Sequence, residues 1–234
     1  MVIEDPWTAL RELTAARLAL GRCGHSLPTR ELLRFQLAHA RARDAVHQPL
    51  DVASLAINPA LVLTSAAEDR TTYLRRPDLG RRLDSASADR LTHGDWDAVL
   101  VVADGLSPIA VHRHAAALID SLIPRLEAWR IAPICIVQQG RVAIGDEIGE
   151  RTGARLAVVL IGERPGLSSP DSLGAYLTWA PSVGRTDAER NCVSNIRNGG
   201  LEPILAAQRI AAIMRAARDR ELTGVRLKIT NLLS

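Results

Sequence analysis

Residues 96–107, which read WDAVLVVADGLS, decide the fold of this chain. Six apolar residues stand in a row and end abruptly at Asp104, and such an unalternating run predicts a strand that is buried on both faces of a sheet. Two more buried strands are predicted at 133–137 and 156–161. Helices are predicted between the three strands, at 109–129 and 144–152. Strands that alternate with helices are typical of a parallel sheet with helices on both faces. We therefore predict an α/β fold, with a Rossmann-like parallel sheet domain over residues 91–234.

Further helices and a further strand are predicted towards the two ends of the chain. Residues 175–179 predict a fourth strand, and residues 203–218 predict a long final helix that follows a polar stretch. Near the amino terminus, residues 5–20 predict a helix, because Asp5 can cap it and Pro6 suits its first turn.

Residues 1–90 predict a smaller, mainly helical N-terminal region. A second helix follows Pro28, with Leu33 and Leu37 on its expected buried stripe, and only a short strand at 61–63 departs from the helical pattern. The region carries many arginines and no candidate chemistry, so we expect it to serve subunit assembly.

The basic residues do not indicate a nucleic-acid-binding protein. All but one of the 29 basic residues are arginine, and they are scattered among acidic residues, which leaves a net charge of +3. Aromatic residues are only 3% of the chain, too few to stack on the bases of a single strand. We therefore expect no nucleic-acid partner. The densest basic patch consists of Arg70, Arg75, Arg76, Arg81 and Arg82. A solvated or subunit-facing surface is favoured there over a polyanion site.

The cysteines and the amino terminus indicate the cellular location that we expect for the protein. Cys23, Cys135 and Cys192 are far apart and show neither Cys-x-x-Cys nor zinc-ligand spacing, so we expect no disulfide framework and no metal site. The segment from Met1 to Pro6 lacks the basic and apolar regions of a signal peptide, and no apolar run is long enough to cross a bilayer. We expect a cytoplasmic protein with no membrane partner.

The carboxyl ends of the predicted strands are the expected ligand edge, because open parallel sheets bind their ligands there. Gly140 follows one strand and Glu163 follows the next, at roughly the spacing with which dinucleotide-binding folds hold a ribose hydroxyl. However, Gly140, Gly145 and Gly149 do not form Gly-x-Gly-x-x-Gly. A pairing with Arg164 or a turn cap explains Glu163 equally well, so the nucleotide signal is weak.

No catalytic constellation is predicted. Cys192 has no base beside it and is more typical of a small buried hydrophobe than of a nucleophile, and Val142 is typical of core. His112 and His114 are two apart on a predicted helix, so they cannot chelate a metal ion together. Ser107 lacks the Gly-x-Ser-x-Gly context of a hydrolase. The residues alone therefore predict a ligand-binding α/β domain.

Seven segments carry a resemblance to a known family. They are LLRF (32–35), YLRRPDLGRRL (73–83), DGLS (104–107), GRV (140–142), DEIGE (146–150), VLIGERPGL (159–167) and NCVSNI (191–196). In order and spacing they resemble the small (light) subunit family of ethanolamine ammonia-lyase along nearly the whole chain. Chance similarity between unrelated α/β domains would not reproduce seven ordered matches.

The resemblance implies an adenosylcobalamin-dependent lyase that converts ethanolamine to acetaldehyde and ammonia by a radical mechanism. It implies a hetero-oligomer in which a large TIM-barrel subunit holds the substrate and the small subunit helps to enclose the cofactor. The family's cobalamin contacts map onto Val142, Glu163 and Cys192. The chain has no Asp-x-His, so the resemblance implies a base-on cofactor whose cobalt this chain does not ligate.

The location and two alternative functions remain open. The match begins almost at Met1, without the long extension that is associated with packaging into a bacterial microcompartment in some family members. We therefore expect free cytoplasmic assembly, with packaging only through the partner. The alternatives are a free-standing nucleotide-binding enzyme, such as a dehydrogenase, and a purely structural interaction module.

Overall fold

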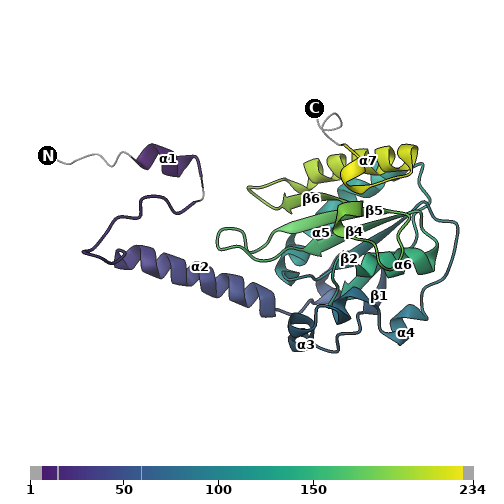
Figure 1. Ribbon diagram of the computed structural model, residues 1–234, viewed down its shortest axis with the longest axis horizontal. Helices are drawn as coiled ribbons and strands as arrows, with labels where there is room; N and C mark the ends of the chain where they lie inside the picture. Colours follow the sequence, from purple (N-terminus) through teal and green to yellow (C-terminus); the bar gives the residue numbers. More distant parts are fainter. Residues whose placement is uncertain (1–6, 15, 59, 229–234) are drawn as a thin grey trace.

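The computed structural model describes residues 7–14, 16–58 and 60–228, which form a sheet domain with a projecting arm (Figure 1). Its six strands are β1 (Ala60–Thr64), β2 (Ala98–Ala103), β3 (Ile134–Gln138), β4 (Leu156–Gly162), β5 (Leu173–Trp179) and β6 (Arg190–Ile196). Its seven α-helices are α1 (Thr8–Glu12), α2 (Thr29–His47), α3 (Arg70–Arg75), α4 (Ser85–Ala88), α5 (Pro108–Leu122), α6 (Ile144–Thr152) and α7 (Pro203–Arg220). Short 3-10 turns are η1 (Val52–Ser54), η2 (Leu79–Arg81), η3 (Ile123–Leu126), η4 (Asp187–Glu189) and η5 (Gly224–Arg226).

The sheet is mixed, with the strand order β1-β3-β2-β4-β5-β6. The first four strands of that order are parallel, whereas β5 is antiparallel to β4 and β6 is antiparallel to β5. The prediction of a purely parallel sheet is therefore wrong for the last two strands. The reason lies in the loop over residues 163–172, which is fully described and contains no helix. A parallel return would need a crossover of about a dozen residues or more, usually helical.

β6 occupies a stretch for which the sequence predicts no strand. Arg190 and Asn191 are 7% exposed, so polar residues stand at buried strand positions. The alternation is further disturbed by a register shift between Leu173 and Ala175 of the neighbouring strand and by a left-handed Asn195 at φ 59. A pattern of apolar residues therefore cannot reveal this strand.

Each face of the sheet carries its own core. In β2, Leu100 and Val102 pack beneath α5 and α7, whereas Val99 and Val101 pack beneath α6 on the other face. The predicted covering of both faces is thus confirmed, and it explains why Ala98–Ala103 is apolar at every position. Across the described residues, none of the helices is both long and apolar enough to span a membrane.

The amino-terminal helices differ from the prediction. α1 ends at Glu12, far short of residue 20, and the predicted cap at Asp5 and Pro6 lies outside the described residues. Leu10 is 44% and Leu13 is 82% exposed. Among the described residues, neither leucine belongs to a hydrophobic core, and packing is what usually stabilises a short helix.

α2 projects from the sheet domain in Figure 1. It buries only Ala45, and the expected buried stripe at Leu33 and Leu37 is instead 57% and 52% exposed. β1, which also lies before residue 91, pairs with β3 and so belongs to the same sheet as the later strands.

Candidate functional site

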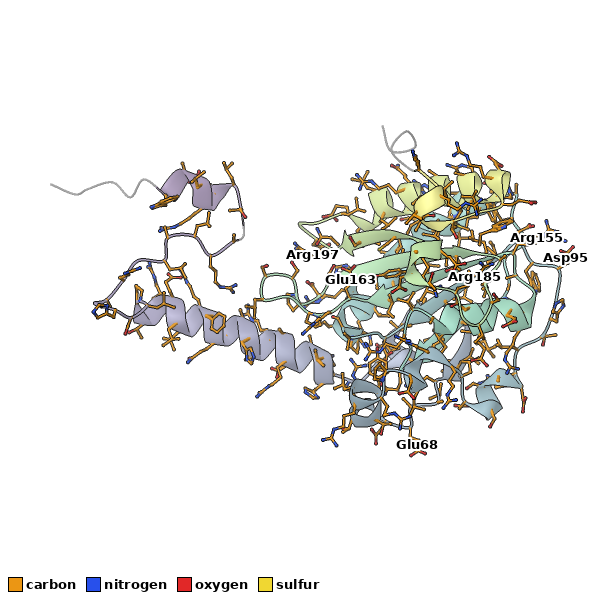
Figure 2. The ribbon with its side chains drawn as sticks, in the orientation of Figure 1. Glu68, Asp95, Arg155, Glu163, Arg185 and Arg197 are labelled. Carbon is orange, nitrogen blue, oxygen red and sulfur yellow. The ribbon has the colours of Figure 1, made fainter. Side chains whose placement is uncertain are left out.

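The carboxyl ends of β2, β3 and β4 meet at one edge of the sheet. The chain leaves β2 towards α5 on one face and leaves β3 towards α6 on the other face. Adjacent strands whose connections diverge in this way open a crevice between their ends, where α/β proteins bind ligands. Figure 2 shows Glu163 and Arg197 at this end of the sheet and Asp95 and Arg155 at the opposite end.

Asp104, directly after β2, organises this edge. Its side chain accepts hydrogen bonds from the backbone N–H groups of Gln139 (2.9 Å) and Gly140 (3.0 Å), and Arg70 lies 3.4 Å away. Asp104 is 1% exposed, and this burial raises the pKa of its carboxyl to about 6 although its partners favour the charged form. Asp104 therefore ties the end of β2 to the loop that follows β3.

Two glycines bring the ends of β2 and β4 together. Gly105 has a φ of +58°, and a Cβ atom there would lie 2.1 Å from the carbonyl oxygen of Gly162. A Cβ atom at Gly162 would lie 2.1 Å from the carbonyl oxygen of Ser107. The close approach lets the N–H of Leu106 donate to Gly162 over 2.9 Å. Larger residues would separate the two loops, so glycine is required at both positions.

A pocket of about 400 Å³ opens at these loops. Its lining residues come from the ends of β2, β3 and β4, from α3 and from β5: Tyr73, Gly105, Leu106, Arg141, Val142, Ile161, Gly162, Glu163, Arg164 and Tyr176. The structure thus brings Val142 and Glu163, both singled out in the sequence, to the same pocket.

Glu163 is held in place within the wall of this pocket. Its carboxylate accepts hydrogen bonds from the hydroxyl of Ser172 and from the backbone N–H of Asn195, the latter over 3.3 Å. A Cβ atom at Gly174 would lie 2.9 Å from the second carboxylate oxygen. Glu163 does not form an ion pair with Arg164 among the described residues, so that alternative is wrong.

Cys192 stands one strand behind the pocket. It is paired in the sheet with Tyr176, which lines the pocket. Cys192 is exposed, contrary to the buried hydrophobe that the sequence suggests. Partial burial of its sulfur, together with the charge of Glu163, raises the pKa of the Cys192 thiol despite a hydrogen bond with Tyr176. A raised pKa suits a contact residue better than a thiolate nucleophile.

Sequence reasoning missed an aromatic and arginine stack at the same edge. Tyr73 is fully buried, with the guanidinium carbons of Arg141 at 4.2 Å and Arg70 at 4.8 Å from the centre of its ring. Its hydroxyl donates to the carbonyl of Gly140 over 3.1 Å. Tyr73 lies in the matched segment 73–83, but only the fold shows that this segment contacts Arg141.

The edge presents polar atoms that have no partner within the described residues. They include Nε of Arg141 and Oε1 of Gln139, both buried. The carboxylate of Glu163, which lines the pocket, offers acceptors to a polar ligand, and Arg141 adds a positive charge to the pocket lining. In the described part of the chain, no group of three His, Cys, Asp or Glu side chains is placed to hold a metal ion. The arrangement can bind and orient a large polar ligand.

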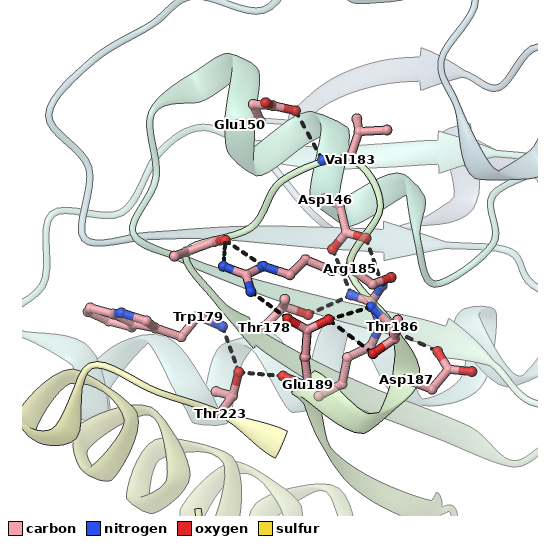
Figure 3. A network of polar contacts seen from close by, with 12 residues as sticks. Asp146, Glu150, Thr178, Trp179, Val183, Arg185, Thr186, Asp187, Glu189 and Thr223 are labelled. Atoms are coloured by element: carbon pink, nitrogen blue, oxygen red, sulfur yellow. Dashed lines mark hydrogen bonds and ion pairs between the residues drawn. The ribbon is translucent and has the colours of Figure 1, made fainter. Parts of the chain in front are cut away.

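A buried ion pair supports the wall beside the pocket (Figure 3). Arg190 donates to both carboxylate oxygens of Asp146, at 2.6 and 2.7 Å, and also to the hydroxyl of Thr178 at 2.7 Å. Nearby, the carboxylate of Glu189 accepts from the N–H of Thr186 over 2.8 Å, which closes the turn before β6. These contacts fix α6 to the antiparallel part of the sheet.

Known proteins show which family has this architecture. Residues 4–228 match the family model of the ethanolamine ammonia-lyase light chain (EutC). The ethanolamine ammonia-lyase small subunit of Ralstonia nicotianae is 57% identical over 97% of this chain and 89% of its own length. The small subunits of Azotobacter vinelandii (57% identical, 96% of this chain, 88% of its own length) and Xanthomonas campestris (54%, 96% and 88%) are also similar. The chain belongs to the family of ethanolamine ammonia-lyase light chains, or small subunits.

Proposed function

We propose that this chain forms one side of the adenosylcobalamin site of an ethanolamine ammonia-lyase, a carbon–nitrogen lyase that converts ethanolamine to acetaldehyde and ammonia. The observation that carries the proposal is the pocket at the carboxyl ends of β2, β3 and β4, where Val142 and Glu163 meet and Cys192 stands one strand away. When bound, the cofactor supplies the radical chemistry, and the residues of this chain hold and orient it.

The donors and acceptors at the pocket fit a corrin ring. Such a ring carries amide side chains, each with an N–H donor and a carbonyl acceptor. The carboxylate of Glu163 would accept from an amide or hydroxyl of the cofactor. Val142 and Cys192 supply van der Waals and backbone contacts. We propose that the cofactor binds in its base-on form and that this chain does not ligate its cobalt.

Glu163→Ala should weaken the affinity of the assembled complex for cobalamin by about tenfold or more, because hydrogen bonds to a charged group contribute roughly 1.5–3 kcal/mol. Glu163→Gln, which keeps an acceptor oxygen, should lose less. The affinity is measured by absorbance titration with hydroxocobalamin. An alanine variant that binds cobalamin as tightly as the original chain would show that Glu163 has no such role.

The partner is proposed to be a large TIM-barrel subunit in a hetero-oligomer. The pocket is open, so another surface must close it over a ligand as large as cobalamin. The arm formed by α1 and α2 extends on the side of the molecule where Glu163 lies (Figures 1 and 2). Its large apolar side chains are exposed: Trp7, Leu10, Leu13, Leu27, Leu32, Leu33, Phe35 and Leu37. We therefore assign the projecting arm of residues 1–90 to subunit assembly. The rest of that region, which includes β1 and Tyr73, joins residues 91–234 in cobalamin binding.

Deletion of residues 1–45 should prevent or strongly weaken assembly with the large subunit, because it removes most of this exposed apolar surface. Co-purification of the truncated chain with a tagged large subunit measures the effect. A truncated chain that assembles as well as the full chain would show that the arm does not serve assembly.

The cytoplasm is the proposed location, with a bacterial microcompartment reached only through the partner.

The function itself is tested by co-expression of both subunits and measurement of ammonia release from ethanolamine, with and without adenosylcobalamin. Activity that requires both chains and the cofactor supports the proposal. An inactive pair, together with a single chain that binds a nicotinamide nucleotide, would favour a free-standing enzyme instead.

A further inference from the structure

We propose that Arg81, Arg82 and Arg141 bind the phosphodiester of the nucleotide tail of cobalamin. The inference rests on the proposed function, because it assigns one part of the same cofactor to a second site. It also gives a role to two arginines of the basic patch for which the sequence favours a solvated or subunit-facing surface.

A groove of about 660 Å³ lies next to the pocket and shares Arg141 and Val142 with it. Its lining includes Arg81 and Arg82 as well as residues 183–187. A ligand that fills the pocket and passes Val142 therefore enters the groove.

The carboxylates of the groove are largely committed to other partners. Asp146 is held by Arg190 at 2.6 and 2.7 Å. Glu147 is held by Arg151 at 2.9 Å. Asp187 stands at the rim with a side chain that is 98% exposed, where water screens its charge.

Arg81, Arg82 and Arg141, which line the groove, form few side-chain hydrogen bonds or ion pairs. Arg185 is paired with Glu189, but Arg81 and Arg82 make no side-chain hydrogen bond or ion pair among the described residues. Arg141 donates one hydrogen bond, from Nη2 to the carbonyl of Tyr73 over 3.3 Å, and its buried Nε has no partner. Positive charge therefore remains available in the groove.

The three arginines are brought together by close backbone packing. The N–H of Arg141 donates to the carbonyl of Gly80 over 2.7 Å, and the N–H of Leu83 donates to the carboxylate of Glu147 over 2.8 Å. A Cβ atom at Gly80 would lie 2.9 Å from Cγ of Arg141. The turn that carries Arg81 and Arg82 is thus fixed against the loop of Arg141 before any ligand arrives.

A phosphodiester matches this site better than the other groups of the cofactor. Guanidinium groups bind phosphate oxygens through paired, charge-assisted hydrogen bonds. The amide side chains of the corrin ring are neutral, whereas the phosphodiester carries a full negative charge. A cofactor with its ring against Glu163 and Val142 would therefore direct its tail towards the groove.

The test compares two corrinoids on the reconstituted two-subunit complex. Hydroxocobalamin carries the nucleotide tail, and cobinamide lacks it. The double variant Arg81→Gln/Arg82→Gln should bind hydroxocobalamin at least tenfold more weakly, as measured by absorbance titration, and should bind cobinamide as tightly as the original complex. Arg81→Lys/Arg82→Lys should recover part of the loss, because charge returns without the paired geometry.

Arg76→Gln is the matched control, since Arg76 belongs to the same basic patch but is paired with Asp78 at 2.7 and 2.9 Å. It should change neither affinity. Equal losses for the two corrinoids, or no loss for either, would overturn the phosphodiester site. A double variant that no longer assembles with the large subunit would also overturn it and make the groove an interface. If the original complex binds neither corrinoid, the proposed function fails as well.

Discussion

Replacement of Arg190 by alanine is expected to lower the free energy of unfolding by about 3–5 kcal/mol, because it leaves the carboxylate of Asp146 buried without its partner. The side chains of both residues are only 2% exposed. The variant also leaves the hydroxyl of Thr178 and the carbonyl of Arg185 without a donor. In a chain of this size the loss corresponds to a fall in melting temperature on the order of 10 °C.

Urea unfolding of the purified chain measures the effect of Arg190→Ala. Arg155→Ala is the matched control, because Arg155 is 57% exposed and forms only long contacts, at 3.5 and 4.0 Å, with Asp95 and Asp97. It should leave stability unchanged within the error of the measurement. The apolar pair Asp146→Leu/Arg190→Met should recover most of the lost stability. A loss below about 1 kcal/mol for Arg190→Ala would contradict the account.

The same ion pair explains why part of the fold escaped prediction. Ala98–Ala103 and Leu156–Gly162 are buried at every position, so local composition reveals these strands. β6 places Arg190 at a buried position, which is tolerable only because Asp146, 44 residues earlier, neutralises it. A contact at that separation leaves no periodic signal in either segment.

The antiparallel direction of β5 was not predicted, for a related reason. A strand of apolar residues reads the same in either direction, and only the connection decides how it pairs. The loop over residues 163–172 had to be recognised as too short and too irregular for a helical crossover. The segment contains Pro165, Gly166 and Pro170, which are compatible with a tight return.

The candidate site was predictable in outline. The rule that ligands bind at the carboxyl ends of strands places Glu163 at the edge, and the loop with Val142 follows a second strand at the same edge. The stack of Arg70 and Arg141 on Tyr73 was not predictable, because it joins residues nearly seventy positions apart. The stripe of α2 was misassigned because an exposed apolar stripe has the same period as a stripe that packs on its own core.

Substitution of Asp104 tests whether the stability of the fold depends on the buried carboxyl at the ligand edge. Asp104→Ala should lower the free energy of unfolding by about 3 kcal/mol or more, since the N–H groups of Gln139 and Gly140 and the guanidinium of Arg70 lose their acceptor. Asp104→Asn keeps the shape and one acceptor oxygen, so it should lose less. Urea unfolding at pH 7 compares the two variants.

The pH dependence gives the sharper test of Asp104. Burial raises the pKa of its carboxyl from 3.8 to about 6, so the folded chain binds this proton more tightly than the unfolded chain. The extra stability that comes from this tighter proton binding is therefore complete below about pH 4 and is lost as the pH rises through 6, whereas the hydrogen bonds from Gln139 and Gly140 still contribute at pH 7. Asparagine does not titrate, and the other carboxyls cancel in the difference. The original chain should therefore gain stability relative to Asp104→Asn between pH 7 and pH 4, on the order of 2–3 kcal/mol. A constant difference would mean that the hydrogen bonds and Arg70 outweigh burial, and that the carboxylate stays charged throughout.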